Sequence, residues 1–344
     1  MDLVTGLAIA TIVVVLLFDY TNGFHDASNI VATVIASRAM TPIQAVIVVA
    51  FFEFLGPLVV GTAVANTIGS FIDVSGLASV DSLIIIMAGI TGAIAWNLGT
   101  WWIGIPSSSS HALVGGLVGP VLVSAGPSNV VWGFQELFFH GHLTGVTKVL
   151  LALILSPLIG FWVGFVLHRV SGLLLRGSRP SLNRKLRLGQ FPTTAWLAFS
   201  HGANDAQKSM GIITLVLVTG GFIGEFEVQF WTILACSTAI TLGILTGGWR
   251  IVRTVGFGIY KVRPLHALNT QLTSAGVIFA ASLVGAPVST THVVSSSIMG
   301  IGASERPKAV RWAKAEDIVT TWLITIPGAG AVGILAWLVL QVLI

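Results

Sequence analysis

Charged residues are scarce in this sequence: Asp, Glu, Lys and Arg make up only 9% of its 344 residues, whereas 54% are hydrophobic. No water-soluble core of this length could bury so much apolar surface. Cysteine is nearly absent as well, and the single Cys236 excludes an internal disulfide and a thiolate metal cluster. The short alternating segments of a transmembrane β-barrel are also lacking. The sequence therefore predicts an all-α, polytopic membrane protein.

Apolar runs of about 20 residues, the length that crosses roughly 30 Å of hydrocarbon as a helix, recur along the chain. The first run follows Asp2 rather than Lys or Arg and has no small-residue cleavage site, so we expect a retained helix and not a signal peptide. The predicted spans are residues 3–20, 42–69, 82–104, 146–170, 192–218, 229–249, 265–284 and 318–343. Two shorter segments, 105–126 and 286–302, are ambiguous.

Basic residues are unevenly distributed among the segments between these spans. Lys and Arg cluster, with Arg38 standing alone, in residues 176–187, 250–263 and 306–314. By the positive-inside rule these segments should lie in the cytoplasm. The loops without Lys or Arg, which should lie outside, are 70–81, 127–145 and 219–228. This arrangement requires a net crossing by each ambiguous segment, which predicts about five transmembrane segments per half and both termini outside.

Two unrelated motifs occur twice at nearly the same spacing. Gly23-Phe-His-Asp26-Ala-Ser-Asn29 recurs 179 residues later as Gly202-Ala-Asn-Asp205-Ala-Gln-Lys208. Ile105-Pro-Ser-Ser-Ser-Ser-His111 recurs 181 residues later as Ala286-Pro-Val-Ser-Thr-Thr-His292. An odd number of crossings in each half makes the halves antiparallel, as in many secondary transporters. We therefore predict two inverted repeats, 1–175 and 192–344, joined by a basic cytoplasmic linker, 176–191.

The Ser/Thr-rich motifs have the pattern of helix starts at membrane depth. Pro106 and Pro287 stand where a helix could begin, and hydroxyl residues fill the first turn. Such an N-terminus offers unpaired amides and a positive dipole end, which suit an oxyanion. The part from His111 to Ala125 would be roughly 22 Å of helix, which is too short to span alone, so we expect a re-entrant, hairpin-like half followed by a short crossing. The alternative is a flexible serine linker, or small residues that allow close helix packing.

Two aspartates, Asp26 and Asp205, lie inside apolar segments, and each has a polar partner three residues later on the same helical face, Asn29 or Lys208. Ionisable groups at bilayer depth cost several kcal/mol unless paired, so they are candidate functional groups. The glycine three residues before each aspartate is expected to let the helix unwind. Freed carbonyls and a carboxylate would then form a cation site. The alternative is an aspartate that caps a helix at the interface.

These motifs resemble the inorganic phosphate transporter (PiT) family, whose signature Gly-Ala-Asn-Asp-x-x-Asn occurs in both halves. The resemblance covers the whole chain, including the approach from Trp96 and Asn97 to Trp102 before the first hairpin. It implies a secondary symporter that imports inorganic phosphate, free or as a metal complex, and a possible homodimer in a bacterial cell membrane. The residues implied to contact phosphate are Ser107, Ser108, Ser109, Ser110, Ser289, Thr290 and Thr291. The residues implied at the coupling-cation sites are Asp26, Asn29, Asn204 and Asp205.

Two departures from the family signature bear on the coupling ion. His25 replaces the first Asn, and Lys208 replaces the last Asn of the second copy. An ammonium beside Asp205 would occupy the space and the charge of a sodium ion, and this variant resembles bacterial members described as proton-coupled. We therefore predict proton coupling, with His25 and the carboxylates as proton carriers.

Four further ionisable residues lie at membrane depth. Glu53 is either a titrating or gating carboxylate in the cavity or a neutral residue bonded to a neighbouring helix. His111, His201 and His292 flank the motifs and are expected to be packing histidines, since their spacing does not suit a zinc site.

The sequence leaves other functions open. A sulfate/proton symporter of the same family could use the same donors, although only hydrogen phosphate carries a proton that it can donate to a carboxylate. A membrane lipid-phosphate phosphatase would need an activated nucleophile and a cationic clamp, but only Lys208 lies deep. An anion channel would need a continuous pore. We expect no enzyme activity, no cofactor, no bound metal, no ATP site and no nucleic acid partner.

Overall fold

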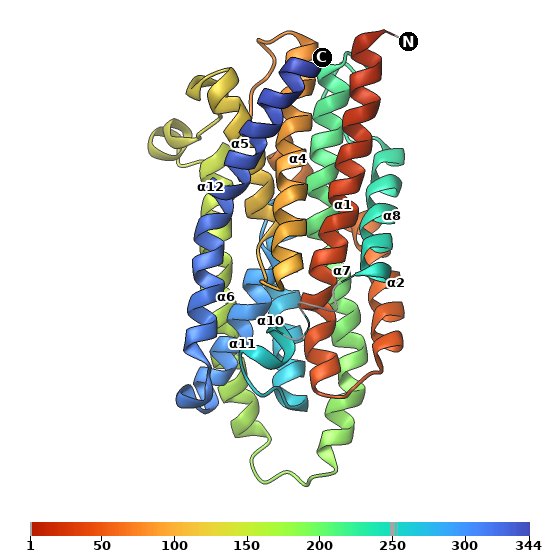
Figure 1. Cartoon of the computed structure of the whole chain (residues 1–344). Helices are drawn as coiled ribbons and strands as arrows, with labels where there is room; N and C mark the ends of the chain where they lie inside the picture. The colour runs from red at the N-terminus through yellow and green to blue at the C-terminus, as the bar shows by residue number, and fades with distance from the viewer. Residues whose placement is uncertain (1, 248–251, 253) are drawn as a thin grey trace.

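The computed structural model describes residues 2–247, 252 and 254–344. In this part of the chain every long element is a helix (Figure 1), and the β contact is an isolated bridge between Ile72 and Val130. The α-helices are α1 (Leu3–Ala36), α2 (Pro42–Val60), α3 (Ala63–Gly69), α4 (Ser79–Ile103), α5 (Ser109–Ser124), α6 (Gly145–Leu174), α7 (Leu182–Thr219), α8 (Phe230–Thr246), α10 (Pro264–Leu283), α11 (Thr290–Glu305) and α12 (Trp312–Leu343). Short helical turns are η1 (Pro127–Asn129), η2 (Glu136–His140), η3 (Thr254–Gly258) and η4 (Pro307–Ala309).

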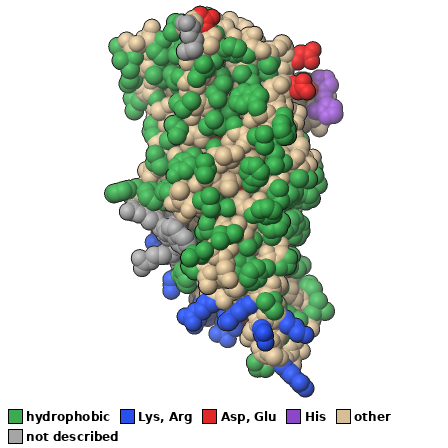
Figure 2. All heavy atoms as spheres, turned by 90° about the vertical axis from the view of Figure 1, so that its right-hand side faces the viewer, with side chains coloured by type: hydrophobic (Ala, Val, Ile, Leu, Met, Phe, Trp, Pro, Cys, Tyr) green, Lys and Arg blue, Asp and Glu red, His purple; other side chains and the backbone are tan. Residues whose placement is uncertain are grey.

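The two termini lie at the same end of an elongated helical bundle (Figure 1). On the face that Figure 2 shows, Asp and Glu side chains lie at this end, Lys and Arg side chains gather at the opposite end, and hydrophobic side chains cover the middle. We call the two ends the acidic end and the basic end. Arg250 and Arg253, which belong to one predicted basic cluster, lie outside the described residues.

Among the described residues, five helices are long and apolar enough to cross a membrane: α1, α2, α4, α6 and α12. The shorter α5 and α11 each belong to a hairpin. The α4–α5 hairpin opens at the acidic end and the α10–α11 hairpin opens at the basic end (Figure 1). Each short helix has 16 residues, or roughly 24 Å, and returns to the end from which its hairpin entered. The predicted net crossings by 105–126 and 286–302 are therefore wrong, because both segments are re-entrant.

α1 and α7 pass through the two aspartate motifs without a break. The predicted unwinding at Gly23 and Gly202 is therefore wrong. Both glycines instead let neighbouring backbones approach: a Cβ at Gly23 would lie 2.0 Å from the carbonyl oxygen of Ile240 on α8, and one at Gly202 would lie 2.2 Å from that of Glu53 on α2. Small residues at helix crossings in membranes have this use.

The unbroken helices also move two predicted boundaries. α1 continues to Ala36, beyond the predicted span 3–20, and α7 begins at Leu182, inside the predicted linker 176–191. The predicted spans are apolar runs, and these runs end at the polar motif residues and at basic residues. In the structure the polar side chains of the motifs are buried and bonded to other helices, so the helix continues through them.

The close contact at Gly23 predicts a loss of stability when a methyl group is added. We expect Gly23→Ala to lower the free energy of unfolding by about 1–3 kcal/mol, because α8 must move away from α1. The matched control is Gly99→Ala on α4, where an added Cβ has no neighbouring atom within 4 Å. The measurement is the melting temperature of each purified variant in detergent. Equal melting temperatures for Gly23→Ala and the unchanged protein would contradict the close crossing.

Candidate functional site

Each Ser/Thr-rich motif lies at the tip of a helical hairpin. Ser108 caps α5 by accepting a hydrogen bond from the amide of His111 at 3.2 Å. Ser289 caps α11 in the same way, by accepting one from the amide of His292 at 3.4 Å. These hydroxyls complete the first turn of each helix, which is the role that serine has at N-caps.

The helices α5 and α11 begin at Ser109 and Thr290, three residues after the motif prolines. Pro106 and Pro287 are therefore not the first helical residues that the sequence predicted. The extended residues between each proline and its helix instead form the hairpin turn. The first amides of α5 and α11 have no carbonyl one turn earlier in their own helices, and the capping hydroxyls accept from the amides of His111 and His292. The amides at 109–110 and 290–291 have the position from which a helix N-terminus binds an anion.

The two hairpin tips meet inside the molecule. The Ser110 hydroxyl donates to the carbonyl oxygen of Val288 at 2.9 Å. The rings of His111 and His292 lie 4.5 Å apart, and His292 stacks on Trp322 at 3.7 Å. The N-termini of α5 and α11 thus face one another, so the partial positive charges of the two helix dipoles lie close together. His111 and His292 have the packing contacts that the sequence predicted.

All seven hydroxyl residues that were predicted to contact phosphate are buried at this junction: Ser107, Ser108, Ser109, Ser110, Ser289, Thr290 and Thr291. Their partners differ. The hydroxyls of Ser107 and Thr100 lie 2.7 Å apart, and Ser110 accepts a hydrogen bond from the Lys208 ammonium at 2.6 Å. The hydroxyl of Ser109 has no partner among the described residues. The tips therefore enclose a cluster of hydroxyl groups with one ammonium beside it.

Asp26 lies next to this cluster, and three donors surround one of its carboxylate oxygens. Its Oδ1 lies 2.8 Å from Nδ1 of His25 and accepts hydrogen bonds from the Asn29 amide at 3.1 Å and the Thr291 hydroxyl at 3.2 Å. Asn29 also donates to the Thr291 hydroxyl at 2.7 Å. The first aspartate motif is therefore bonded directly to the tip of the second hairpin.

Asp205 has the matching position on α7. Its Oδ1 lies 2.7 Å from the ammonium of Lys208, and its Oδ2 accepts a hydrogen bond from the Asn22 amide at 3.2 Å. Lys208 is completely buried and also donates to the hydroxyl of Ser110 and, at 3.1 Å, to the carbonyl of Val288. A buried ammonium requires such a set of partners, because it costs several kcal/mol to remove from water. The ion pair thus holds the two hairpin tips together.

The residue before each aspartate contacts the hairpin of its own half. Nε2 of His25 lies 3.3 Å from the hydroxyl of Ser107 at the first tip. Asn204 donates to the carbonyl of Ala286 at 3.1 Å and accepts from the amide of Val288 at 3.1 Å at the second tip. Asn204 therefore contacts hairpin backbone rather than a carboxylate. The two motif copies make corresponding contacts, which places both aspartates at equivalent positions under the tips.

His201 links the two carboxylates and was expected from the sequence only to pack. Its Nε2 lies 3.7 Å from Oδ2 of Asp26 and 3.6 Å from Oδ2 of Asp205, and its Nδ1 lies 2.5 Å from Oε1 of Glu53. All four side chains are buried. Glu53 is therefore bonded to a neighbouring helix and also belongs to the site. The signal for His201 was its spacing: residues 201, 205 and 208 share one face of a helix.

One candidate cation cluster lies at this point among the described residues: Asp26, His201 and Asp205 each place a potential ligand atom within 4.8 Å of the others. Hard cations such as sodium require oxygen ligands. The two carboxylates are surrounded instead by donors, including the Lys208 ammonium and the Asn22 and Asn29 amides. The unbroken helices offer no freed carbonyls here. The geometry therefore suits positive charge carried by the side chains themselves.

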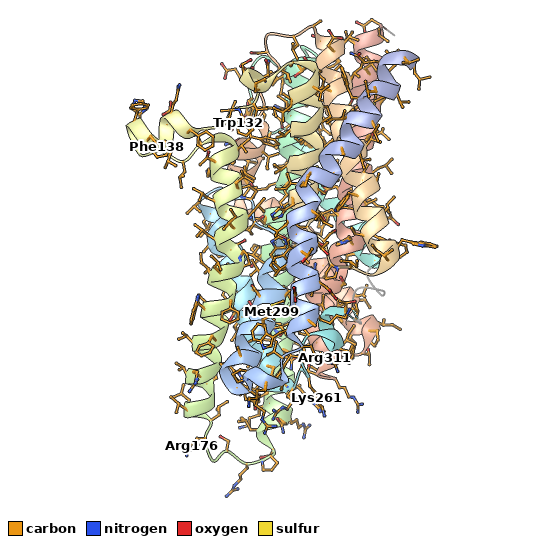
Figure 3. All side chains as sticks on the ribbon, turned by 60° about the vertical axis from the view of Figure 1, so that its left-hand side comes forward. Trp132, Phe138, Arg176, Lys261, Met299 and Arg311 are labelled. Carbon is orange, nitrogen blue, oxygen red and sulfur yellow. The ribbon has the colours of Figure 1, made fainter. Side chains whose placement is uncertain are left out.

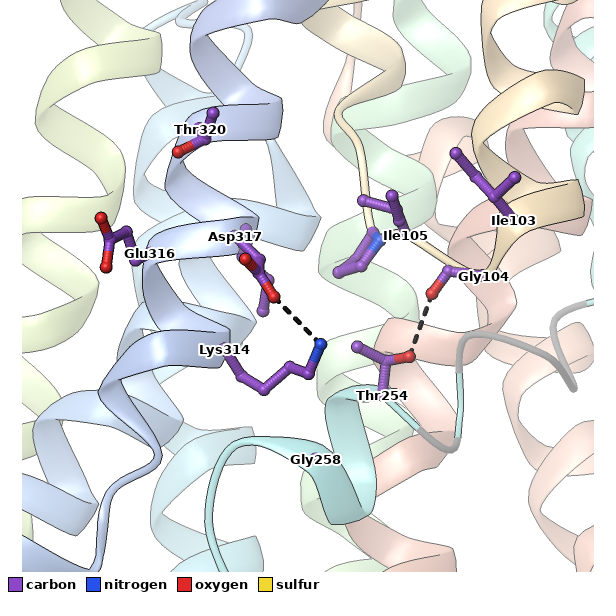
Figure 4. A pocket seen from close by; sticks show the side chains of 11 residues that line it. Ile103, Gly104, Ile105, Thr254, Gly258, Lys314, Glu316, Asp317 and Thr320 are labelled. Carbon is purple, nitrogen blue, oxygen red and sulfur yellow. Dashed lines mark hydrogen bonds and ion pairs between the residues drawn. The ribbon is translucent and has the colours of Figure 1, made fainter.

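A cavity of about 590 Å³ lies between the first hairpin tip and the basic end (Figure 4). It reaches Pro106, one residue from Ser107, and it is also lined by Thr254, Thr320 and Lys314. We call this cavity the vestibule. Figure 4 shows the Thr254 hydroxyl donating to the carbonyl oxygen of Gly104 (3.0 Å), and Lys314 paired with Asp317 (2.9 Å). The vestibule thus approaches the hydroxyl cluster from the basic end.

Comparisons with known proteins agree with this geometry. The sequence model of the phosphate transporter family matches residues 22–188 and 175–333. A Bacillus subtilis (strain 168) protein named "Probable low-affinity inorganic phosphate transporter" is 41% identical over 345 residues, which cover 100% of each chain. A protein of the same name from Rhizobium meliloti (strain 1021) is 42% identical over 333 residues, 96% of each chain. A solved structure titled "The sodium-dependent phosphate transporter" superposes with a TM-score of 0.87 over 98% of this chain and 100% of that chain, at 22% identity.

A buried polar junction between two hairpin tips in a bundle of apolar helices defines a multi-pass membrane transporter. The chain belongs to the phosphate transporter family, as its motifs predicted. Its substrate class is therefore inorganic phosphate, and nothing in these comparisons favours sulfate transport. The family and these relatives are transporters and not enzymes, so the phosphatase alternative is not supported.

Proposed function

We propose that this protein is a proton-coupled symporter that imports inorganic phosphate by alternating access. The observation that carries the proposal is the buried ion pair of Lys208 and Asp205, which reaches the hairpin tip through Ser110. The ammonium lies where a coupling sodium ion would neutralise the carboxylate. This half of the site then has no need of sodium.

Phosphate would bind between the two hairpin tips. The donors available there are the hydroxyls of 107–110 and 289–291, the first amides of α5 and α11, and the Lys208 ammonium. Neutral donors can surround a tetrahedral oxyanion without adding buried charge. Hydrogen phosphate can also donate its proton to a carboxylate such as Asp26 or Asp205, which sulfate cannot. This difference favours phosphate over sulfate in the same site.

Protons would bind next to the phosphate, at His201, His25 and the carboxylates. Without protons, the negative charges of Asp26, Asp205 and Glu53 exceed the single positive charge of Lys208 and oppose an incoming anion. Protonation of Glu53 and of His201 would remove this excess. Phosphate therefore binds better to the protonated state, and this difference in affinity couples proton entry to phosphate entry.

Alternating access would use two inverted halves, 1–175 and 192–344, with the linker 176–191 between them. Glycine crossings related between the halves support this plan. A Cβ at Gly56 on α2 would lie 2.2 Å from the carbonyl oxygen of Phe199 on α7, and one at Gly243 on α8 would lie 2.1 Å from that of Tyr20 on α1. We propose that the basic end faces the cytoplasm of a bacterial cell, with both termini outside, and that phosphate leaves through the vestibule.

The structural neighbour named for sodium dependence does not decide the coupling ion here, because 22% identity supports a shared fold alone. The test uses the purified protein in liposomes, with labelled phosphate uptake driven by an inward proton gradient in the absence of sodium. We expect gradient-dependent uptake that excess sulfate does not block and that Asp205→Asn abolishes. Uptake that requires sodium and ignores the proton gradient would contradict proton coupling. Uptake that sulfate blocks would favour the sulfate symporter.

Thr320 lines the vestibule and is exposed. If the vestibule opens to the cytoplasm, reagents should reach this position from the cytoplasmic side alone. Cys236 is buried, so a cysteine introduced at position 320 supplies the accessible thiol. We expect a maleimide that cannot cross membranes to label Thr320→Cys in inside-out vesicles and not in intact cells. The matched control is Asp73→Cys at the acidic end, which should be labelled only in intact cells. Labelling of Thr320→Cys in intact cells would contradict the proposed orientation.

A further inference from the structure

A second hollow, of about 480 Å³, lies at the basic end and shares no lining residue with the vestibule. Four separate parts of the chain contribute to it: the end of α1, the first turns of α7, the segment before α10 and the segment before α12. Its basic lining residues are Arg38, Arg187, Lys261, Arg263 and Arg311. Figure 3 shows Lys261 and Arg311 at this end of the molecule. We call this feature the arginine hollow.

The positive charge of the arginine hollow is mostly uncompensated. Arg263 pairs with Glu305 at 2.8 Å, and Glu305 also lies 2.7 Å from Nε2 of His266. Within the described ranges, Arg38, Arg187 and Lys261 pair with no carboxylate, and the residues outside those ranges include no Asp or Glu. Several cations at one place repel one another, so their convergence is unfavourable unless an anion joins them.

Two of these arginines also have a distinctive backbone environment. The amide of Arg311 donates to the carbonyl oxygen of Ile259 at 3.0 Å, and its Nη1 donates to those of Phe257 at 3.2 Å and Gly258 at 3.4 Å. Among the described residues, its side-chain hydrogen bonds use Nη1 alone. Arg38 has a φ of 56°, a left-handed conformation that is unfavourable in a residue other than glycine. The positive-inside rule accounts for the number of basic residues at this end, but not for their convergence or this strain.

We infer that the arginine hollow binds the phosphoryl group of an anionic ligand, at a place distinct from the transport site. Guanidinium groups match phosphate geometry with paired N–H donors, and basic pockets between membrane helices bind anionic head groups. The ligand is a phospholipid head group or free phosphate. Exposed Phe257 at the rim offers an apolar surface to a lipid chain, whereas free phosphate is the transported substrate. Either ligand would link the end of α1 to the start of α10. It would thereby stabilise the position of the α10–α11 hairpin at the basic end.

The test measures the melting temperature of the full-length protein in detergent during titrations with inorganic phosphate, short-chain phosphatidylglycerol and short-chain phosphatidylcholine. The hollow variant carries Arg38→Gln, Arg187→Gln and Lys261→Gln, all at exposed positions where folding should be preserved. The matched control carries Arg176→Gln, Arg179→Gln and Lys308→Gln, which change the charge of the same end equally. Phosphate bound at the hairpin tips stabilises all three proteins alike, so differences between them report the arginine hollow.

We expect at least one phosphoryl anion to bind the hollow variant about tenfold or more weakly than the unchanged protein, with the control unaffected. An effect confined to phosphatidylglycerol identifies the lipid head group, and one confined to phosphate identifies the free anion. Equal losses in both variants would overturn the proposal, since general surface charge would then explain binding. So would equal stabilisation by phosphatidylcholine, or the absence of any difference between the hollow variant and the unchanged protein. If the triple variant fails to fold, Lys261→Gln alone decides the same comparison.

Discussion

Lys208→Asn is expected to take up phosphate in response to sodium, whereas the unchanged protein responds to protons. The substitution restores the asparagine of the family signature and removes the ammonium that lies 2.7 Å from Asp205. Removing one partner of a buried ion pair leaves an uncompensated charge, which costs about 3–5 kcal/mol. A sodium ion can supply the missing charge, with the new amide oxygen and the Asp205 carboxylate as ligands. Proton-driven uptake without sodium should then fall by about tenfold or more.

The measurement for this prediction is labelled phosphate uptake by Lys208→Asn in liposomes, with sodium and the proton gradient varied separately. The melting temperature should also rise with sodium, because an ion that binds only the folded state stabilises it. Lys208→Met is the matched control, since it removes the charge but offers no oxygen ligand, and sodium should not rescue it. If Lys208→Asn still depends on protons and ignores sodium, the ammonium does not stand in for a coupling cation.

His201→Gln is expected to lower phosphate uptake by about a hundredfold and to remove its dependence on the proton gradient. His201 lies between Asp26 and Asp205 and contacts Glu53, so its ring is positioned to carry a proton among three carboxyl groups. The glutamine amide can keep a hydrogen bond to Glu53, but it cannot accept a proton. The fold should therefore survive while coupling is lost.

Uptake and melting temperature measured on the same samples test this role of His201. The matched control is His292→Gln, which removes an equally buried histidine that stacks on Trp322. We expect the control to retain gradient-driven uptake. Equal loss of uptake in the two variants, or normal uptake in His201→Gln, would contradict a proton-carrying role.

Several parts of the site could be predicted because a physical rule connects the residue pattern to the geometry. Ser108 and Ser289 cap re-entrant helices, as hydroxyls followed by apolar residues indicate. Asp26 and Asp205 are buried with partners three residues later, as helical spacing requires. These features depend on neighbours along the chain, which the sequence displays directly.

Other parts depend on contacts between segments far apart in the sequence. A glycine can unwind a helix or let two backbones approach, and only the positions of α2 and α8 decide that Gly23 and Gly202 do the second. His201 could have been placed on the face of Asp205 by its spacing, but nothing local indicates that Asp26 on α1 lies opposite. The net crossings were inferred from charge alone, and a hairpin that returns to the same end satisfies the same charge pattern.

The most direct test of the account is to observe the coupled proton. Liposomes that contain the protein and a trapped pH indicator receive phosphate outside, at equal pH on both sides and without sodium. We predict acidification inside, because each phosphate enters with protons, and no acidification with Asp26→Asn. If the interior does not acidify, and phosphate enters only after sodium is added, the protein is coupled to sodium and not to protons.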